Sequence, residues 1–382
     1  MSAVGVSYAQ SGSVTLYGIV DTGYEFSSSK LNTHWAANNS GTSVKTKKAG
    51  LKSGGLSASR VGFKGQEPLG NGLSATFHME MRFNSANGAW RSHKTAAGET
   101  VTGFAARTLV GLKGPFGHFA LGRENTPIDN NVFPLDIQGH TRNDIPLTGK
   151  VEGLFYNGQF GGLGVEATVG RNQSVTTEGG VKTEDKVSEF GYGVGLKYST
   201  GAFSIAGVAQ QFRPGTIKRD ASGNITSDTR GRKDEFGLAV SYKLGDVRLV
   251  SNYIYAKSSP RNSNAYSRWE HLNFGVEYKS GPFTAVAEVG RNRAKALNHI
   301  EKLGKHYGDA VTSAFPGDFR LKGAGTNFVV GGNYAFSKRT DLYVRGGRRG
   351  ALNATVYNPD GTVRGKVKGH TNYVFAGLRH RF

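Results

Sequence analysis

The chain has 382 residues with 48 Lys and Arg against 28 Asp and Glu, a formal net charge of +20, and no cysteine. The lack of cysteine excludes a disulfide scaffold, a thiolate metal site and a cysteine nucleophile, and the apolar runs are far shorter than the ~18 residues of a membrane-spanning helix. Because 22 Phe, 16 Tyr and 3 Trp exclude wholesale disorder, the positive charge belongs to a folded protein that meets nucleic acid, an anionic membrane or a solute inside it.

Residues 1–9 have neither the positive charge nor the apolar length of a full secretory signal. Ser7, Tyr8 and Ala9 have the small-x-small pattern that ends a signal peptide, with Gln10 as the first mature residue. We therefore expect 1–9 to be a signal-peptide remnant and 10–382 to be a single domain. The alternative is a short disordered N-terminus.

From Val14 onward the chain alternates with period two. Between Leu73 and Phe83, for example, every second residue is apolar, whereas His78 and Glu80 lie on the other face. This alternation is typical of β-strands and not of helices. It recurs in sixteen segments: 13–26, 56–67, 72–83, 104–113, 117–123, 151–160, 162–172, 188–199, 202–213, 234–244, 246–257, 269–280, 283–294, 325–337, 340–350 and 370–382.

The gaps between these segments are alternately short and long. The long gaps include 27–55, 84–103, 124–150, 214–233 and 295–324. All ten prolines fall in gaps on this map, as expected because proline cannot donate a hydrogen bond to a sheet. One end of the sheet therefore carries nearly all of the loops.

The polar face of the predicted strands is unusually rich in charge. It includes Lys64, Arg82, Arg107, Lys197, Lys243, Arg248, Arg345, Arg379 and Arg381, with Asp21, Glu80, Glu166, Glu189, Glu235 and Glu277. A hydrated interior and a lipid-facing exterior satisfy both faces, and closure removes the strand edges that lipid cannot solvate. The sequence therefore predicts an all-β fold, a 16-stranded antiparallel transmembrane β-barrel, which is wide enough to leave an aqueous channel.

The chain ends in Phe382, on the apolar phase of the last predicted strand. In a membrane barrel we interpret this terminal aromatic residue as an assembly signal. The alternative is simply a strand that runs to the end of the chain.

The sequence resembles the general porins of betaproteobacteria, the neisserial and Burkholderia-type outer-membrane family. The matching stretches occur in the expected order along the whole mature chain: VTLYG at 14–18, RVGFKGQE at 60–67, LGNGL at 69–73, FNS at 83–85, VGLK at 110–113, FG at 116–117, LGR at 121–123, FSKRT at 336–340 and GLRHRF at 377–382.

This resemblance implies a homotrimer of sixteen-stranded barrels in which the third long loop, 124–150, folds inward and narrows the pore. It also implies a constriction wall of arginines that favours anions, to which Arg60, Arg107 and Arg142 correspond. Arg82 and Lys64 join this set because they share the inward phase. The acids that would face this wall from the loop are Glu124, Asp129 and Asp136. The loop departs from the family pattern at its three prolines, so its conformation and the pore diameter stay open.

We expect an outer-membrane channel for passive diffusion of small hydrophilic solutes and ions, with anions preferred. Its expected partners are outer-membrane lipid and lipopolysaccharide, with no nucleic acid, cofactor, metal or enzymatic activity. The basic run 45–52 is either a solvated loop or a site for lipopolysaccharide phosphate. Two alternatives remain: a substrate-specific anion channel, and a soluble basic β-protein that binds nucleic acid or acidic polysaccharide.

Overall fold

The computed structural model describes residues 12–36, 39–94, 100–135, 137, 145–178, 181–261, 263–299 and 317–382. Within these ranges no helix has the length and hydropathy needed to cross a bilayer. The predicted signal remnant, 1–9, lies outside the described residues.

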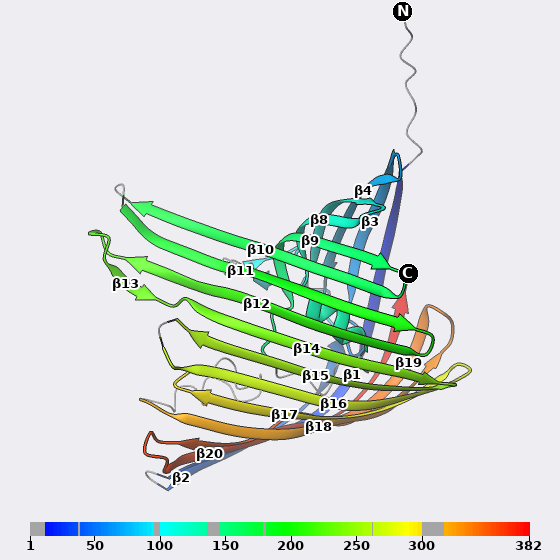
Figure 1. Cartoon of the computed structure of the whole chain (residues 1–382). Helices are drawn as coiled ribbons and strands as arrows, with labels where there is room; N and C mark the ends of the chain where they lie inside the picture. Colours follow the sequence, from blue (N-terminus) through cyan, green and yellow to red (C-terminus); the bar gives the residue numbers. More distant parts are fainter. Residues whose placement is uncertain are drawn as a thin grey trace, which may run out of the picture.

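Almost all of the described chain belongs to one antiparallel sheet (Figure 1). Its strands are β1 (Ser13–Trp35), β2 (Ser40–Ser53), β3 (Arg60–Gly70), β4 (Leu73–Arg82), β7 (Arg107–Gly114), β8 (Gly117–Asn125), β9 (Lys150–Phe160), β10 (Leu163–Glu178), β11 (Val181–Thr200), β12 (Phe203–Arg219), β13 (Ile225–Asp228), β14 (Gly231–Leu244), β15 (Val247–Pro260), β16 (Tyr266–Ser280), β17 (Phe283–Leu297), β18 (Arg320–Ala335), β19 (Thr340–Tyr357) and β20 (Val363–Arg381). A separate short hairpin is formed by β5 (His93–Lys94) and β6 (Thr100–Val101).

These strands form a closed barrel with sixteen positions around its wall. β2 and β3 follow one another along β1, and β13 continues the line of β14 along β12, so each of these pairs occupies one position. β20 pairs back onto β1 from Ile19↔Arg381 to Trp35↔Gly365, which closes the sheet without a free edge. The predicted sixteen-stranded antiparallel barrel is therefore confirmed.

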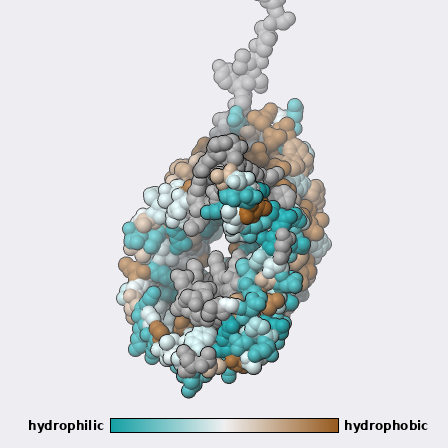
Figure 2. Space-filling view, turned by 90° about the vertical axis from the view of Figure 1, so that its left-hand side faces the viewer, coloured by the Kyte–Doolittle hydropathy of each residue, from teal (hydrophilic) through white to brown (hydrophobic). Residues whose placement is uncertain are grey.

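The two faces of the wall carry the residues that the alternation assigned to them. Val289, Phe328 and Val374 are among the many outward apolar residues that are 36–68% exposed. Polar residues such as Asn252 and Asn327, each at most 1% exposed, point inward. Seen from the end that carries the long loops, the barrel is a ring of largely hydrophilic residues around a central hollow (Figure 2).

Several strands extend further toward the loop end than the sequence predicts. Residues 27–55 were expected to be a long loop, but β1 and β2 pair there from Thr22↔Ser53 to Trp35↔Ser40. Residues 41–49 of β2 are exposed on both faces of the strand, so this part of the hairpin lacks the apolar alternation by which the sequence reveals a strand.

The prediction that all prolines fall between strands is wrong for three of them. Pro68 lies in β3, Pro214 in β12 and Pro260 at the end of β15. The pairing of β12 with β11 skips Pro214, since it passes from Arg213 to Gly215 across an irregularity. Proline is tolerated at such a bulge because no ladder hydrogen bond is required of it.

The interruption between β2 and β3 folds against the inner wall. The carboxylate of Asp21, which is fully buried, accepts the N–H groups of Leu56 at 2.9 Å and Ser57 at 2.7 Å. The hydroxyl of Tyr343 on β19 donates to the same carboxylate. Asp21 thus joins the seam of the barrel to residues 54–59, which the sequence placed partly in a strand.

The two ends of the barrel meet at Phe382. Its N–H donates to the carbonyl of Gly18 at 3.1 Å, and the N–H of Gly18 donates to the carbonyl of Phe382 at 3.0 Å. A side chain at Gly18 would overlap the Phe382 ring, so this glycine makes room for it. The last residue therefore contributes to closure, although its role as an assembly signal stays a prediction.

Candidate functional site

A cluster of arginines lines one wall of the lumen. Arg60 on β3 lies directly opposite Arg82 on β4, and Glu80 on β4 lies opposite Arg107 on β7. All of these positions are on the inward phase. Each of the three guanidinium side chains is 24% exposed, which leaves it in contact with the lumen.

Glu80 lies between Arg60 and Arg82 and is shared by both. Its carboxylate is 3.4 Å from Arg60 Nη1 and 3.3 Å from Arg82 Nε, and it accepts the hydroxyl of Tyr17 at 3.0 Å. The carboxylate is nearly buried, so it fixes the two guanidinium groups in place from behind the lumen surface. One negative charge offsets only part of the charge of two arginines.

Arg107 pairs with Glu124 rather than with an acid across the pore. Its Nη2 is 2.7 Å from Glu124 Oε1. Glu124 was expected to lie in the third loop, but it belongs to β8, on the same wall as Arg107. The expected opposition between Glu124 and the arginines is therefore wrong: regular pairing of β8 with β9 continues through Asn125, one residue beyond it.

Lys150 adds a fourth cation that the sequence analysis missed. It is the first residue of β9, its Nζ donates to Asn125 Oδ1 at 2.5 Å, and it lies within electrostatic reach of Arg82 and Arg107. No sequence pattern marks Lys150, because it lies at the boundary between a loop and a strand.

The segment after β8 packs against the opposite side of the lumen. It contains the short helices η1 (Ile128–Val132) and η2 (Phe133–Leu135). Ile128, Val132 and Leu135 form an apolar cluster with residues of β12, β14 and β15, namely Ala206, Val208, Ala239 and Ile254. The cluster lies inside the barrel, and the small and branched side chains of the strands form the surface on which the segment packs.

Glycines on the inner wall bring this segment close to the strands. A Cβ at Gly237 would lie 2.7 Å from Val132 Cγ2, and one at Gly193 would lie 3.2 Å from Pro127 Cγ. Gly191, Gly193 and Gly195 thus form a lumen-facing glycine surface, and the last two lie against Pro127 and Asn131 at the start of the loop.

Hydrogen bonds hold the same segment in place and shield two acidic side chains from water. Asn130 and Asn131 donate to the two oxygens of Glu166 at 2.7 and 2.8 Å. The N–H of Thr148 donates to Glu235 at 2.7 Å. As a result Glu166 is 6% exposed and Glu235 is fully buried. The described part of the loop therefore lies on the inner wall, while the inward path of the whole loop stays a prediction.

The other predicted site residues fall in three places. Asp129 lies in the first turn of η1, within electrostatic reach of Lys150. Lys64 lies nearer the turn end, with its Nζ 5.7 Å from the centre of the Tyr17 ring. Arg142 and Asp136 lie outside the described residues.

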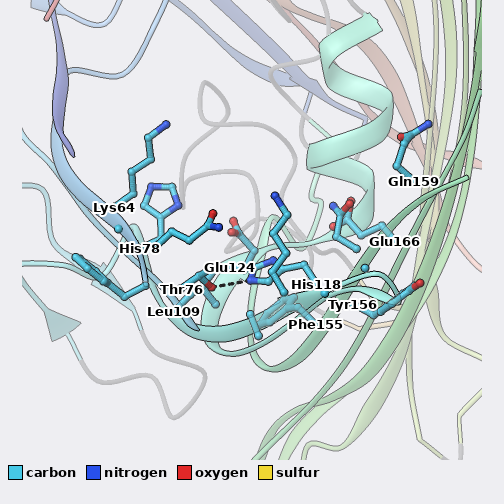
Figure 3. A pocket seen from close by; sticks show the side chains of 18 of the residues that line it. Lys64, Thr76, His78, Leu109, His118, Glu124, Phe155, Tyr156, Gln159 and Glu166 are labelled. Carbon is cyan, nitrogen blue, oxygen red and sulfur yellow. Dashed lines mark hydrogen bonds between the residues drawn. The ribbon is translucent and has the colours of Figure 1, made fainter. Parts of the chain in front are cut away.

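A cavity of about 760 Å³ opens on the turn side of this cluster. Its lining includes Lys64 and His78 on one side and Glu166 and Gln159 on the other, with η1 beside Glu166 (Figure 3). A neighbouring cavity of about 600 Å³ reaches Arg107. Among the described residues, no group of three or more His, Asp or Glu is arranged to hold a metal ion.

Comparison with known proteins gives one matching family. The family model described as "Gram-negative porin" matches residues 1–351. The chain is 29% identical over 270 residues to outer membrane porin protein 32 of Delftia acidovorans, covering 65% of each chain. It is 27% identical over 377 residues to major outer membrane protein P.IB of Neisseria meningitidis serogroup A, covering 97% of this chain and 94% of that protein.

Solved structures share the fold at low sequence identity. The anion-selective porin from Comamonas acidovorans superimposes with a TM-score of 0.61 at 22% identity, covering 97% of this chain and all of that one. The trimer form of OmpT from Vibrio cholerae gives a TM-score of 0.60 at 16% identity, covering 98% of this chain and all of that one.

Proposed function

The chain belongs to the Gram-negative porin family, and from this premise we propose that its lumen passes small hydrophilic solutes and ions by diffusion, with anions preferred over cations. It is an outer-membrane channel protein and not an enzyme. The preference for anions depends on the charged residues that line the lumen of this chain.

The observation that supports this preference is the difference in exposure between the lumen arginines and two neighbouring acids. On the β3–β9 wall, Arg60, Arg82 and Arg107 keep partial contact with the lumen. Glu166, on β10 next to that wall, and Glu235, on β14 across the lumen, are covered by the loop segment and accept hydrogen bonds from it. Positive charge therefore faces the water while these two acids are withdrawn from it.

Coulomb's law gives the size of the effect. An anion ~6 Å from one unneutralised guanidinium gains ~0.7 kcal/mol in water and ~3 kcal/mol at an effective dielectric constant of about 20. Because the Debye length is about 8 Å at physiological ionic strength, the field acts mainly at the narrow part of the lumen. Even the lower energy concentrates a monovalent anion about threefold and depletes a cation by the same factor.

Reversal potentials across a KCl gradient in planar bilayers test this proposal. We expect the wild-type potential to lie toward the equilibrium potential of chloride. A potential toward that of potassium would refute the preference for anions.

A second candidate function is a channel with a saturable anion site. Lys64 and Lys113 both line the larger cavity, and neither forms an ion pair with a carboxylate among the described residues. A saturable site predicts that a dicarboxylate or phosphate blocks the single-channel chloride current at submillimolar concentration, whereas a simple diffusion pore passes it without block.

We also propose a homotrimer, assembled through the arc of short strands. β3, β4, β7 and β8 have 8–11 residues, against 16–20 for β10, β11 and β12. The outward face of the short arc carries Arg123, whose guanidinium is neutralised by Glu152. Light scattering of the detergent-solubilised protein tests this: a monomer mass under non-denaturing conditions would contradict it.

A further inference from the structure

The segment between β2 and β3, residues 54–59, is longer than the strand opposite it requires. The pairing of β1 with β2 ends at Thr22↔Ser53, and the pairing of β1 with β3 begins at Ile19↔Arg60. Two residues of β1 therefore lie opposite six residues, which leaves four in excess of the regular register. Extra residues of this kind are frequent beside functional sites, where they redirect a side chain. We call residues 54–59 the inner strap, because they fold against the lumen face of the wall.

The inner strap is bonded along its length to one residue of β1, Asp21. At its first end, the N–H of Gly54 donates to the main-chain carbonyl of Asp21 at 2.8 Å. At its last end, the hydroxyl of Ser59 donates to the same carbonyl at 3.1 Å and accepts the N–H of Asp21 at 3.0 Å. Between these ends, the carboxylate of Asp21 accepts the N–H groups of residues 55–57 at 3.3, 2.9 and 2.7 Å. Asp21 therefore holds both ends and the middle of the strap.

Apolar packing brings the inner strap closer to the wall than a side chain at Gly55 would permit. Leu56 packs against a buried, largely aromatic cluster on β18, β19 and β20. A Cβ at Gly55 would overlap the ring of Phe375 and the hydroxyl of Tyr343. Gly54 has a φ of +76°, which glycine adopts without steric cost. Two adjacent glycines thus allow the strap to turn and to lie directly on the wall.

The inner strap leads into Arg60 and bonds to its guanidinium group. The carbonyl of Ala58 accepts the Nε–H of Arg60 at 3.0 Å, while the carboxylate of Glu80 lies 3.4 Å from Nη1. The strap also contacts a second inward arginine, since Nη1 of Arg379 donates to Ser57 Oγ at 2.9 Å. A carbonyl satisfies an N–H of arginine without neutralising its charge, whereas a carboxylate does both. Ala58 therefore limits the pairing of Arg60 with Glu80.

We propose that the inner strap sets the position of Arg60 in the lumen, and that Asp21 is the positioning residue that holds the strap. The strap acts through Arg60, so its effect rests on the anion preference proposed above. With Ala58 in place, Arg60 has one N–H on a neutral acceptor and keeps contact with the water of the lumen. Without this acceptor, Glu80 is the partner that remains to Arg60 among the described residues, and closer pairing would neutralise the guanidinium.

The test compares the full-length wild-type channel with two glycine-to-alanine variants, neither of which changes a charge. Gly55→Ala should move the strap roughly 1–2 Å toward the lumen, because an ordinary contact with the Phe375 ring requires about 3.5–4.0 Å. Gly50→Ala on β2 is the matched control, because no atom lies within 4 Å of its added Cβ. Neutralisation of one guanidinium ~6 Å away lowers the local chloride concentration about threefold in water. The preference for chloride over potassium, measured as a reversal potential, should therefore fall on the order of threefold in Gly55→Ala and stay unchanged in Gly50→Ala.

Two variants of Arg60 show whether the strap acts through this residue. In an Arg60→Gln channel, Gly55→Ala should cause no further shift of the reversal potential, because the side chain that the strap positions is gone. Arg60→Lys keeps the charge but lacks the Nε–H that bonds to Ala58, so it should also lower the preference for chloride. This lysine variant leaves the strap intact, and it tests the proposal even if Gly55→Ala does not fold.

The outcomes separate the role of the strap from the anion preference itself. An anion-selective wild type beside an equally selective Gly55→Ala channel would overturn the role of the strap and leave the anion preference standing. The same holds if Gly55→Ala shifts the potential equally with and without Arg60, or if Arg60→Lys is as selective as the wild type. A wild type that prefers potassium would overturn both.

Discussion

Gly237→Val is expected to weaken the packing of the η1 segment against the inner wall and to add current levels above the wild-type level. A Cβ at this position would lie 2.7 Å from Val132 Cγ2 and 3.2 Å from Ile128 Cδ1, whereas an ordinary contact is about 3.5–4.0 Å. The segment must therefore move by about 1 Å at Val132 before the two further methyl groups of valine are accommodated. It cannot move sideways without loss, because Ala239 and Val208 pack around it.

The magnitude follows from the balance between overpacking and burial. Overpacking of this kind costs roughly 1–3 kcal/mol. Burial of Ile128 and Val132, both fully buried, stabilises the seated segment by about 1.5–3 kcal/mol each. The two burial energies sum to about 3–6 kcal/mol and exceed the cost of overpacking, so the seated state stays predominant. The cost of overpacking raises the population of the displaced state roughly 5- to 150-fold. Single-channel recordings should then show added current levels above the wild-type level.

The matched control is Gly207→Val on β12. No atom lies within 4 Å of a Cβ added at Gly207, so the same substitution there should leave the single-channel current unchanged. The assay is single-channel recording of both variants in the same bilayers, with strand content checked by circular dichroism. A Gly237→Val trace identical to that of the control would refute the seating of η1 on this wall.

Three further predictions concern closure, the seam and the arginine cluster. Removal of Phe382 should reduce the fraction of protein that reaches a heat-modifiable folded form, because the chain loses its paired backbone contacts with Gly18; equal yields would contradict this role. Asp21→Asn should lower the stability by about 1–3 kcal/mol, since the buried N–H donors and the Tyr343 hydroxyl lose a charged acceptor; an unchanged thermal transition would show that the seam does not depend on the charge. Glu80→Gln removes one negative charge from between two lumen arginines, so the reversal potential should shift further toward the chloride value; a shift toward the potassium value would contradict the assignment.

The sequence predicts the barrel well because the bilayer imposes a local rule on every strand. An outward residue such as Phe328 meets lipid and its neighbour Asn327 meets the lumen, so each segment carries its own signal. The rule ends where a strand is exposed to water on both faces, as β2 is over residues 41–49. The outer hairpin of β1 and β2 was therefore missed, although its backbone pairing is continuous to Trp35↔Ser40.

Part of the arginine cluster could be predicted from the sequence for the same reason. The inward phase identifies Arg60, Arg82 and Arg107 without knowledge of the fold. It does not reveal which acid neutralises which arginine, because Glu124 could belong to the end of a strand or to the loop. The packing of η1 against the wall depends on Gly237, and the residues next to it, Val132 and Ile128, are far away in the sequence. No local pattern encodes such a contact.

The most direct test of the account is the reversal potential of Arg60→Gln with Arg107→Gln, measured beside the wild type across a KCl gradient. Lys338→Gln serves as the control, because this exposed residue lies in the turn between β18 and β19 and its charge lies outside the lumen. Each neutralised arginine removes at least ~0.7 kcal/mol of attraction for an anion ~6 Å away. Two such losses lower the local anion concentration about tenfold and raise that of a cation by the same factor. The potential of the double variant should therefore move away from the chloride value, while the control stays at the wild-type value. A double variant as anion-selective as the wild type would contradict the assignment of selectivity to this wall.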